Sequence, residues 1–474
     1  MRKIVPIFCL LFFSVAACAI NPVSGKRELS LVSEKEEIAL GQKTDVEIRS
    51  QYGVYADLSL NEYITSVGNV LVPHTQRPQL IYSFAVLDTP VVNAFAVPGG
   101  YIYVTRGALA MMNSESELAV VLGHELGHVN ARHSVRRLSK LLLVQLGLAV
   151  GGAISDTFAK ISGAASLGVQ LLFLKYSRDD ERDADSLGVE YARRGSYNPG
   201  EMISFFSSLQ RLGDLSGKHS LPGFLSTHPL TSERIQNVKL MVTENDKLLP
   251  VKNESYLQQV DHIVYGDDPR QGYVEGNVFY YPQLRFYFSF PQDWQLQNTP
   301  AQVVLASKDE NAVLVLQAEK TEEGLADYAQ KKATTIEGRQ FLDEKNFLIN
   351  GLSSFHQLYN VVQEEKETLR IRLSFIKKGS YIFSFSALAT ALQFGKYDSD
   401  FLNIISSFNE LKDKAHLDRQ PQHLLILKAN GKQRLQEILE KAGMKKDLWP
   451  TAAILNGMEL NDIPERNQLI KIIQ

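Results

Sequence analysis

Apolar residues recur with a helical period through most of residues 19–248. A short interruption at 81–106 breaks this pattern. There the segments IYSFAVLDTP and NAFAVPGGYIYVT are rich in aromatic and β-branched residues, which favour strands, and Pro98-Gly99-Gly100 predicts a turn. The pattern therefore predicts a mainly α-helical domain that contains a small sheet.

The pattern changes between about 268 and 412. The stretch LRFYFSF at 284–290 places Leu284, Phe286, Phe288 and Phe290 on one face, which is typical of a half-buried strand. The strand-like segments NAVLVLQA and LRIRLSFIKKGSYIFSFSA follow, and Lys377-Lys378-Gly379-Ser380 predicts a hairpin turn. With helical stretches near 323–335 and 397–407, these strands predict an α+β domain.

Residues 418–474 predict one very small βααβ module. HLLILKA has a strand pattern, RLQEILEKAG a helical one, and AAILNGMELNDIPERNQLIKII a helix followed by a strand. The polar stretch LKDKAHLDRQPQ at 411–422 is the predicted linker. The sequence shows no convincing repeat of about 20–50 residues, which argues against a helical-repeat array.

Two uncharged runs, 141–155 and 161–174, interrupt the helical pattern. Each is shorter than the roughly 20 residues that span a bilayer, and their glycines argue against a rigid transmembrane pair. Buried helices joined by a mobile loop are the simplest interpretation. A lid over a site and a surface that dips into lipid are the alternatives.

The overall composition indicates an ordinary globular protein. A chain of 474 residues suggests about three domains, and its formal net charge is −3. This balance lacks the basic footprint of nucleic-acid-binding proteins, so we expect no nucleic-acid partner.

The first 17 residues read as a signal peptide. Arg2 and Lys3 precede an apolar run, and Val15-Ala16-Ala17-Cys18 resembles a bacterial lipobox, in which Cys18 is lipidated. A plain secretory signal is the alternative. Ala19 after the cysteine favours outer-membrane sorting in a Gram-negative bacterium, with a periplasmic body. We therefore expect a signal peptide at 1–17 and domains at 18–248, 268–412 and 418–474.

The segment VVLGHELGHVNARH at 120–133 carries candidate metal chemistry. Ser114 and Glu117 form a capping pattern that predicts a helix start, and His124 and His128 then share one face of that helix. Two neutral imidazoles at this spacing can bind one zinc ion, and the adjacent Glu125 can take a proton from water. A chance occurrence on an ordinary helix is the alternative.

Two acids downstream are spaced in the same way. In YSRDDERDADSLGVEYARRG, Glu181 and Asp185 are four residues apart and share a helix face. Glu181 is a candidate third ligand, and Asp185 a candidate partner for the second nitrogen of a ligand histidine. Read alone, such acids are usually part of a solvated helix face.

Together, HELGHVNARH and YSRDDERDAD resemble the zinc metallopeptidase family that includes HtpX and the CAAX prenyl proteases. The resemblance covers roughly residues 25–240 and implies a gluzincin-type domain with one Zn²⁺ per chain. It implies metal ligation by His124, His128 and Glu181, catalysis by Glu125, and a supporting role for Asp185.

The resemblance also implies a substrate strand and a further histidine. NAFAVPGGYIYVTRGAL resembles the strand before the active-site helix, whose exposed edge would bind an extended substrate; the alternative is a buried hairpin. LSTHPLTSERI matches a segment in which His228 approaches the zinc, either to stabilise the oxyanion or to block the site. Arg234 is a weaker candidate for an ion pair with Glu181 or Asp185. The expected substrate contacts are Asn93, Ala94, Phe95 and Ala96.

The downstream segments resemble non-catalytic modules. The region that begins GYVEGNVFYYPQLRFYFSF resembles a PsbP-like domain, and ILNGMELNDIPERNQLIKII resembles a LysM-like fold, with NGKQRLQEI where that motif usually has a G-D-T-L stretch. Because of this departure, peptidoglycan is a weakly expected partner, and a degenerate packing module is the alternative. The chain resembles the BepA type of lipoprotein in this family without its helical repeats.

The expected function is zinc-dependent endopeptidase activity in envelope protein quality control. The expected partners are extended or unfolded envelope proteins, together with the outer membrane through the N-terminal lipid. The alternative is a periplasmic assembly factor or chaperone-like scaffold with little or regulated proteolysis.

Overall fold

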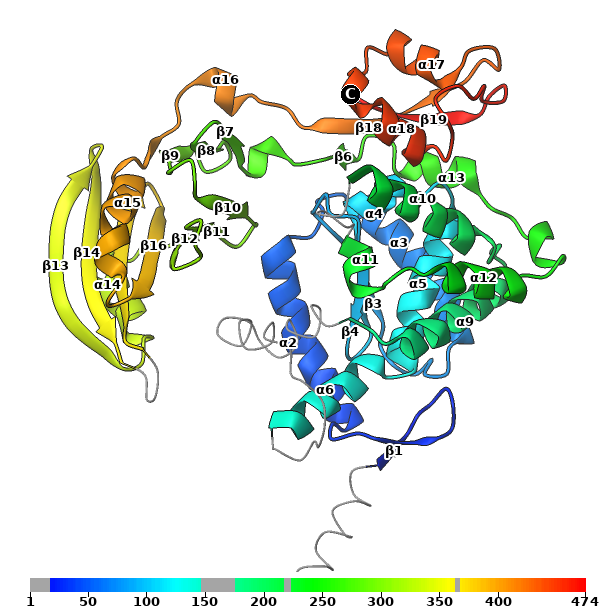
Figure 1. Cartoon of the computed structure of the whole chain (residues 1–474), viewed down its shortest axis with the longest axis horizontal. Coiled ribbons are helices and arrows are strands. Elements are labelled where there is room, and N and C mark those ends of the chain that lie inside the picture. The colour runs from blue at the N-terminus through cyan, green and yellow to red at the C-terminus, as the bar shows by residue number, and fades with distance from the viewer. Residues whose placement is uncertain (1–17, 146–174, 217–222, 363–366) are drawn as a thin grey trace, which may run out of the picture. The chain divides into compact units, whose positions relative to one another are not determined.

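The computed structural model describes residues 18–145, 175–216, 223–362 and 367–474 (Figure 1). The predicted signal peptide and most of the apolar stretch 141–174 lie outside the described residues. The chain divides into two compact units. The first comprises Met1–Arg49, Gly53–Gly266 and Gln422–Gln474, and the second comprises Ser50–Tyr52 and Asp267–Pro421. Among the described residues, no helix combines the length and apolar character needed to cross a membrane.

Helices form most of the first unit, as the hydrophobic pattern predicts. The helices up to Gln259 are α2 (Glu34–Tyr52), α3 (Leu58–Leu71), α4 (Arg106–Met111), α5 (Glu115–Asn130), α6 (His133–Gln145), α9 (Arg178–Arg194), α10 (Glu201–Ser216), α11 (Gly223–Thr227), α12 (Ser232–Met241) and α13 (Asn253–Gln259). A two-stranded sheet of β1 (Cys18–Ile20) and β2 (Arg27–Leu29) precedes them.

The predicted small sheet is confirmed. Its strand order is β3 (Ser83–Leu87), β5 (Tyr101–Thr105), β4 (Ala94–Val97), so β4 lies at an edge. The turn between β4 and β5 contains Gly99 at φ 83° and Gly100 at φ 97°, a left-handed backbone that glycine adopts without steric cost. The predicted turn at Pro98-Gly99-Gly100 therefore joins two antiparallel strands.

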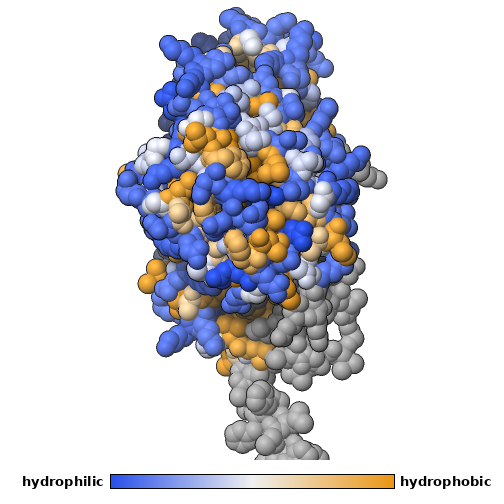
Figure 2. All heavy atoms as spheres, turned by 90° about the vertical axis from the view of Figure 1, so that its left-hand side faces the viewer, coloured by the Kyte–Doolittle hydropathy of each residue, from blue (hydrophilic) through white to orange (hydrophobic). Residues whose placement is uncertain are grey.

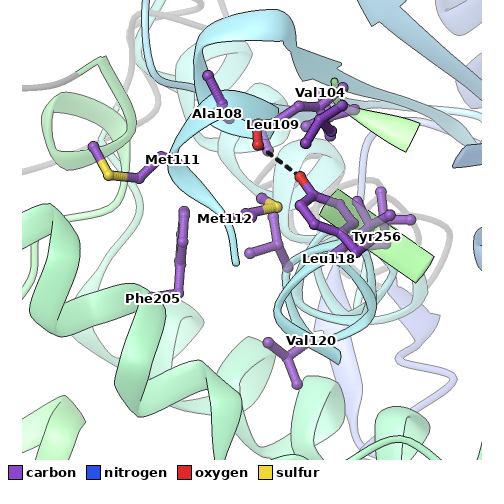
Figure 3. Packing of buried hydrophobic residues seen from close by; sticks show 14 of the residues in the cluster. Val104, Ala108, Leu109, Met111, Met112, Leu118, Val120, Phe205 and Tyr256 are labelled. Atoms are coloured by element: carbon purple, nitrogen blue, oxygen red, sulfur yellow. Dashed lines mark hydrogen bonds between the residues drawn. The ribbon is translucent and has the colours of Figure 1, made fainter. Parts of the chain in front are cut away.

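The core of the first unit surrounds α4 and α5. Figure 3 shows Tyr256, from α13, with its hydroxyl directed at the carbonyl of Leu109, to which it donates a 2.6 Å hydrogen bond. Met112, Leu118 and Phe205 pack in the same cluster. Every residue of α5 is buried, which is why the helix is not amphipathic.

The C-terminal segment belongs to this same unit. Its elements are β18 (Gln422–Lys428), α17 (Leu435–Lys441), α18 (Trp449–Leu455) and β19 (Leu469–Ile473), in the predicted order of strand, helix, helix, strand. The strand β18 pairs with β19 and with β6 (Val264–Tyr265), which follows α13 in the chain. Apolar residues of the segment, among them Leu424 and Ile470, join the large core cluster.

The second unit contains two sheets. The seven-stranded sheet has the order β10 (Gln295–Asn298), β11 (Val303–Ala306), β12 (Ala312–Lys320), β16 (Tyr381–Thr390), β15 (Leu369–Lys378), β14 (Leu352–Val361), β13 (Arg339–Ile349). The four-stranded sheet has the order β17 (Asn409–Glu410), β9 (Phe286–Ser289), β8 (Val278–Tyr281), β7 (Tyr273–Glu275). The helices are α14 (Leu325–Thr334), α15 (Phe394–Ser406) and α16 (Lys414–Leu417).

Local patterns predict this second unit well. Phe286, Phe288 and Phe290 are buried, as their period-2 spacing indicates. The predicted hairpin joins β15 to β16 through Gly379 at φ 60°. The outer strand β13 is exposed over most of its length and carries the exposed apolar residues Phe341, Leu342, Phe347 and Leu348. On the face drawn in Figure 2, apolar side chains form separate patches between hydrophilic ones.

Candidate metal centre

The helix α5 presents both motif histidines. Its N-cap is Ser114, whose side chain accepts a hydrogen bond from the backbone N–H of Glu117, so the predicted helix start is confirmed. His124 and His128 lie one turn apart, and both are almost fully buried. A buried helix face with two imidazoles needs partners for the ring nitrogens; α9 supplies Asp185 to His124, and α6 supplies His133 to His128.

Small residues allow α5 and α9 to approach closely. A Cβ atom on Gly123 would lie 3.1 Å from the carbonyl oxygen of Gly188, and one on Gly127 would lie 3.1 Å from Cα of Ala184. Larger side chains at these positions would hold the helices apart. The short separation is what brings Glu181, near the start of α9, to the histidines.

His124, His128, Glu181 and His228, called here the metal group, each offer one ligand atom, and these atoms all lie within 4.8 Å of one another. Nε2 of His124 is 3.0 Å from Nε2 of His128 and 3.3 Å from Nδ1 of His228. Oxygens of Glu181 lie 3.6 Å and 3.7 Å from the Nε2 atoms of His124 and His128, and 3.0 Å from Nδ1 of His228.

These separations fit a metal ion. Ligand atoms at the corners of a tetrahedron, about 2.0–2.1 Å from zinc, are about 3.4 Å apart. The separations given above, 3.0–3.7 Å, scatter around that value, and no two of the ligand atoms are more than 4.8 Å apart. Three imidazole nitrogens and one carboxylate oxygen are also the donor types that zinc binds in proteins.

Glu125 lies beside the metal group and has no exposed surface. Neither of its oxygens has a hydrogen-bond partner of good geometry among the described residues, and Oε1 is 3.7 Å from Nε2 of His228. Burial raises the pKa of Glu125, while His228, His124 and the backbone amide of Ala96 oppose that rise. A buried carboxylate with free oxygens and a raised pKa is suited to proton transfer.

Asp185 and Arg234 contact residues of the metal group without being ligands themselves. Oδ1 of Asp185 lies 3.0 Å from Nδ1 of His124. Arg234 donates to both oxygens of Asp185 at 2.7 and 2.6 Å and lies 2.7 Å from Oε2 of Glu181. Burial alone would raise the pKa of Asp185, but the hydrogen bonds from Arg234 and His124 outweigh it and hold the pKa below its ordinary value. Arg234 thus contacts both acids of the predicted pair.

The predicted substrate strand lies close to Glu125. Ala94, Phe95 and Ala96 form part of β4, and Asn93 precedes it, with its backbone N–H bound to the Thr105 hydroxyl at 3.0 Å. The backbone N–H of Ala96 points to the Glu125 carboxylate and lowers its pKa. Ala96 therefore lies beside the proposed proton acceptor, in a strand whose four residues are all buried.

Sequence reasoning missed two aromatic contacts and one histidine. Tyr176 stacks on His128 with ring centroids 3.8 Å apart, and Phe224 stacks on His228 at 4.7 Å. His133 approaches His128 at 2.8 Å between the two Nδ1 atoms, and burial lowers the pKa of His133 to about 3. Both His133 and Tyr176 stand inside the motif segments, but their roles depend on tertiary contacts that spacing does not reveal.

A cavity of about 400 Å³ adjoins the metal group. Glu181 and Arg234 contribute to its wall, and the other lining residues are Lys175, Tyr176, Ser177, Arg178, Arg182, Pro229, Thr231 and Glu233. The centre therefore has open space on the side of α9 where the helix begins.

Cys18, the predicted lipidation site, is the first residue of β1 and pairs with Leu29. This backbone pairing does not test the lipid, and lipidation stays a prediction.

Two of the comparisons with known proteins find similarity to peptidases. Residues 59–242 match the family model described as Peptidase family M48. The chain is 29% identical over 258 residues to a protein named Beta-barrel assembly-enhancing protease from Yersinia pestis, covering 52% of each chain. It is 28% identical over 229 residues to one named Mitochondrial metalloendopeptidase OMA1 from Schizosaccharomyces pombe, covering 47% of this chain and 66% of that protein.

The chain spans about half the length of the first of these relatives. Among solved structures, cyanobacterial PsbP from Synechocystis matches 29% of this chain and 94% of its own at 12% identity, with a TM-score of 0.25. So low a score supports no conclusion about the second unit.

Proposed function

Because residues 59–242 form a Peptidase family M48 domain, we propose that the protein is a zinc-dependent endopeptidase that hydrolyses peptide bonds of envelope proteins. The observation that carries the proposal is the buried metal group next to Glu125, a carboxylate with no hydrogen bond of good geometry among the described residues. A structural role would satisfy such a carboxylate, because an unpaired buried charge is costly.

Different residues would bind the metal and transfer the proton. His124, His128 and Glu181 would hold Zn²⁺, which in such a site lowers the pKa of a bound water to about 7 and polarises a carbonyl group. Glu125 accepts the proton of the attacking water and returns it to the leaving amide nitrogen. Its raised pKa suits both steps, because a carboxylate with a very low pKa would hold the proton too weakly.

The edge strand β4 is the proposed substrate-binding element. An extended peptide that pairs with β4 would bind through backbone hydrogen bonds, which tolerate varied side chains. The proximity of Ala96 to Glu125 would place a substrate carbonyl near the proton acceptor. This arrangement supports unfolded or extended envelope proteins as the substrate class, in envelope quality control.

His228 has two proposed roles. Its Nδ1 lies within 3.3 Å of atoms of both His124 and Glu181, which supports binding as a fourth ligand that closes the site. Its Nε2 has no hydrogen-bond partner among the described residues, which supports an alternative role in stabilising the oxyanion. Replacement of His228 with Ala separates the two, since activity rises if it closes the site and falls if it stabilises the oxyanion.

We also propose a periplasmic location with a lipid anchor at Cys18, probed by labelling with radioactive palmitate and comparison with Cys18→Ala. The name of the Yersinia relative, a β-barrel assembly-enhancing protease, supports an outer-membrane setting. Binding of the C-terminal segment to peptidoglycan stays a proposal. Sedimentation of the purified full chain with peptidoglycan tests it.

The central experiment measures zinc content and cleavage of an unfolded protein such as casein. Glu125→Gln should keep zinc and lose about 10²–10⁴-fold in kcat, since general acid–base catalysis contributes that much. Glu181→Ala should lose zinc, while Glu190→Ala, on the exposed side of the same helix, should bind it normally. Zinc binding by Glu181→Ala at wild-type strength would show the metal assignment to be wrong.

The closed geometry around His228 favours a second candidate function, that of an assembly factor or chaperone-like scaffold with little or regulated proteolysis. A strain that carries Glu125→Gln distinguishes the candidates. A wild-type envelope in this strain supports the scaffold, because client binding does not need proton transfer. A phenotype equal to that of a deletion supports the peptidase.

A further inference from the structure

His133 lies directly behind a proposed zinc ligand. It is fully buried, and its Nδ1 is 2.8 Å from Nδ1 of His128. Its other ring nitrogen, Nε2, lies 3.8 Å from Oδ1 of Asp180 and 3.9 Å from Oδ2 of Asp183. The His-Glu-x-x-His pattern assigns nothing to a histidine five positions after its last residue.

A break between two helices brings His133 to this position. On an uninterrupted helix, a residue five positions later would lie about 140° around the axis from His128. Instead α5 ends at Asn130, and Arg132 adopts φ 54°, in the left-handed region. The Arg132 side chain is held by Glu37 at 2.8 Å and by the carbonyl of Val32 at 3.0 Å. These contacts fix the turn that returns His133 to His128.

The geometry determines which nitrogens carry protons. If His128 binds zinc through Nε2, its neutral ring carries the proton on Nδ1 and must donate from there. The nearest acceptor is Nδ1 of His133, so the proton of His133 is on Nε2, the side of Asp180 and Asp183. From this arrangement, which rests on the proposed zinc site, we propose that His133 is the positioning residue of His128.

His133 thus orients the ring of His128 through its Nδ1, as Asp185 orients the ring of His124. The two partners differ in charge, because Asp185 is an acid and His133 is an uncharged ring. Glu125, Glu181 and Asp185 already place three buried acids around one arginine, Arg234. A neutral acceptor orients the second ligand without adding a fourth buried carboxylate, which would be costly to desolvate.

The test is the zinc affinity of the full-length chain, measured by competition with a chromogenic chelator. His133→Phe removes the acceptor and should weaken zinc binding 10–100-fold, the usual effect of losing the group that orients a ligand. His133→Asn places an amide oxygen where Nδ1 was and should recover most of that affinity. The control is His356→Phe, which removes a buried histidine of the second unit and should leave zinc affinity unchanged.

A direct measurement on the wild-type protein needs no variant. In zinc-loaded protein labelled with ¹⁵N-histidine, His133 should appear as the tautomer protonated at Nε2, and His128 as the one protonated at Nδ1. A His133 protonated at Nδ1, or wild-type zinc affinity in folded His133→Phe, overturns the inference alone. Absence of zinc binding by the wild type overturns the proposed function and the inference with it.

Discussion

Two clusters of buried charged side chains lie at different points along α5 of the first unit. Near the start of the helix, Glu117 lies close to Lys471 of β19, and further along the helix lies the metal group with Glu125. Lys471 and Glu125 have no exposed surface at all, and the other members of both clusters have almost none. Burial and charge therefore do not distinguish a structural cluster from a catalytic one.

The two clusters differ in how their polar atoms are satisfied. Nζ of Lys471 donates to the carbonyls of Ala110 at 2.9 Å, Met111 at 3.2 Å and Leu455 at 3.2 Å, and to that of Met112. Three of these carbonyls come from the C-terminal end of α4 and its cap, whose carbonyls have no partners inside the helix. Glu117 in turn accepts the backbone N–H of Asn113 at 2.8 Å.

At the metal group, by contrast, both oxygens of Glu125 and Nε2 of His228 have no hydrogen-bond partner among the described residues. Native proteins rarely leave such groups unpaired, because the desolvation cost is not recovered. This difference is the one expected if the saturated cluster stabilises the fold and the unsaturated one holds the proposed metal and proton acceptor. Unsatisfied polar atoms are therefore the better indicator of function in this unit.

The largest effect on stability is expected for Lys471→Met. This change leaves four buried carbonyls without their donor, each at a cost of about 1–3 kcal/mol, so unfolding should become easier by about 3–5 kcal/mol. Urea denaturation followed by circular dichroism measures the difference. Lys428→Met, an exposed lysine on the neighbouring strand β18, is the control and should change the value by less than about 0.5 kcal/mol. Equal stability of the two variants would contradict the structural role of Lys471.

A smaller effect of opposite sign is expected for Glu125→Gln in metal-free protein. The substitution removes a buried carboxylate that has no hydrogen bond of good geometry, so the metal-free protein should become more stable by about 1–3 kcal/mol. The same variant is expected to lack peptidase activity. Thermal unfolding in the presence of a chelator measures the change, and a lower melting temperature than wild type would show that Glu125 contributes to the fold.

The sequence predicts those parts of this comparison that depend on local spacing. His124, His128, Glu181 and Asp185 are recognisable because a separation of four residues fixes a shared helix face. The strands around Phe286 and Phe288 are likewise visible in a period of two. In each case the residues whose spacing makes the prediction lie within about one turn of a helix or within one strand.

The parts that the sequence does not predict depend on contacts between distant segments. From the sequence, Lys471 is a single charged residue in a predicted C-terminal strand. Its burial at the end of α4 follows only from the folded structure. His133 reads as a continuation of the active-site helix, because an arginine in the left-handed region gives no composition signal for a break. Small residues at 123, 127, 184 and 188 were visible, but their pairing required the packing of α5 on α9.

The smallest expected effect is a change in how the free energy of unfolding depends on pH. It tests whether Glu117, beside Lys471, is charged in the folded protein. Burial raises the pKa of Glu117 to about 8, against an ordinary value of 4.5. Between those values the unfolded chain releases the Glu117 proton while the folded protein keeps it, so stability falls as pH rises, by at most about 1.4 kcal/mol per pH unit.

Lys471 opposes this trend only at higher pH. Burial lowers the pKa of Lys471 to about 7 from 10.5, so its contribution to stability increases with pH above 7. The window from pH 5 to 7 therefore isolates Glu117. Over that window Glu117→Gln should show a flatter dependence of the free energy of unfolding on pH than the wild type, measured by urea denaturation at each pH unit. Parallel curves would mean that Glu117 ionises in the folded protein, and that its charge is compensated by Lys471 rather than suppressed by burial.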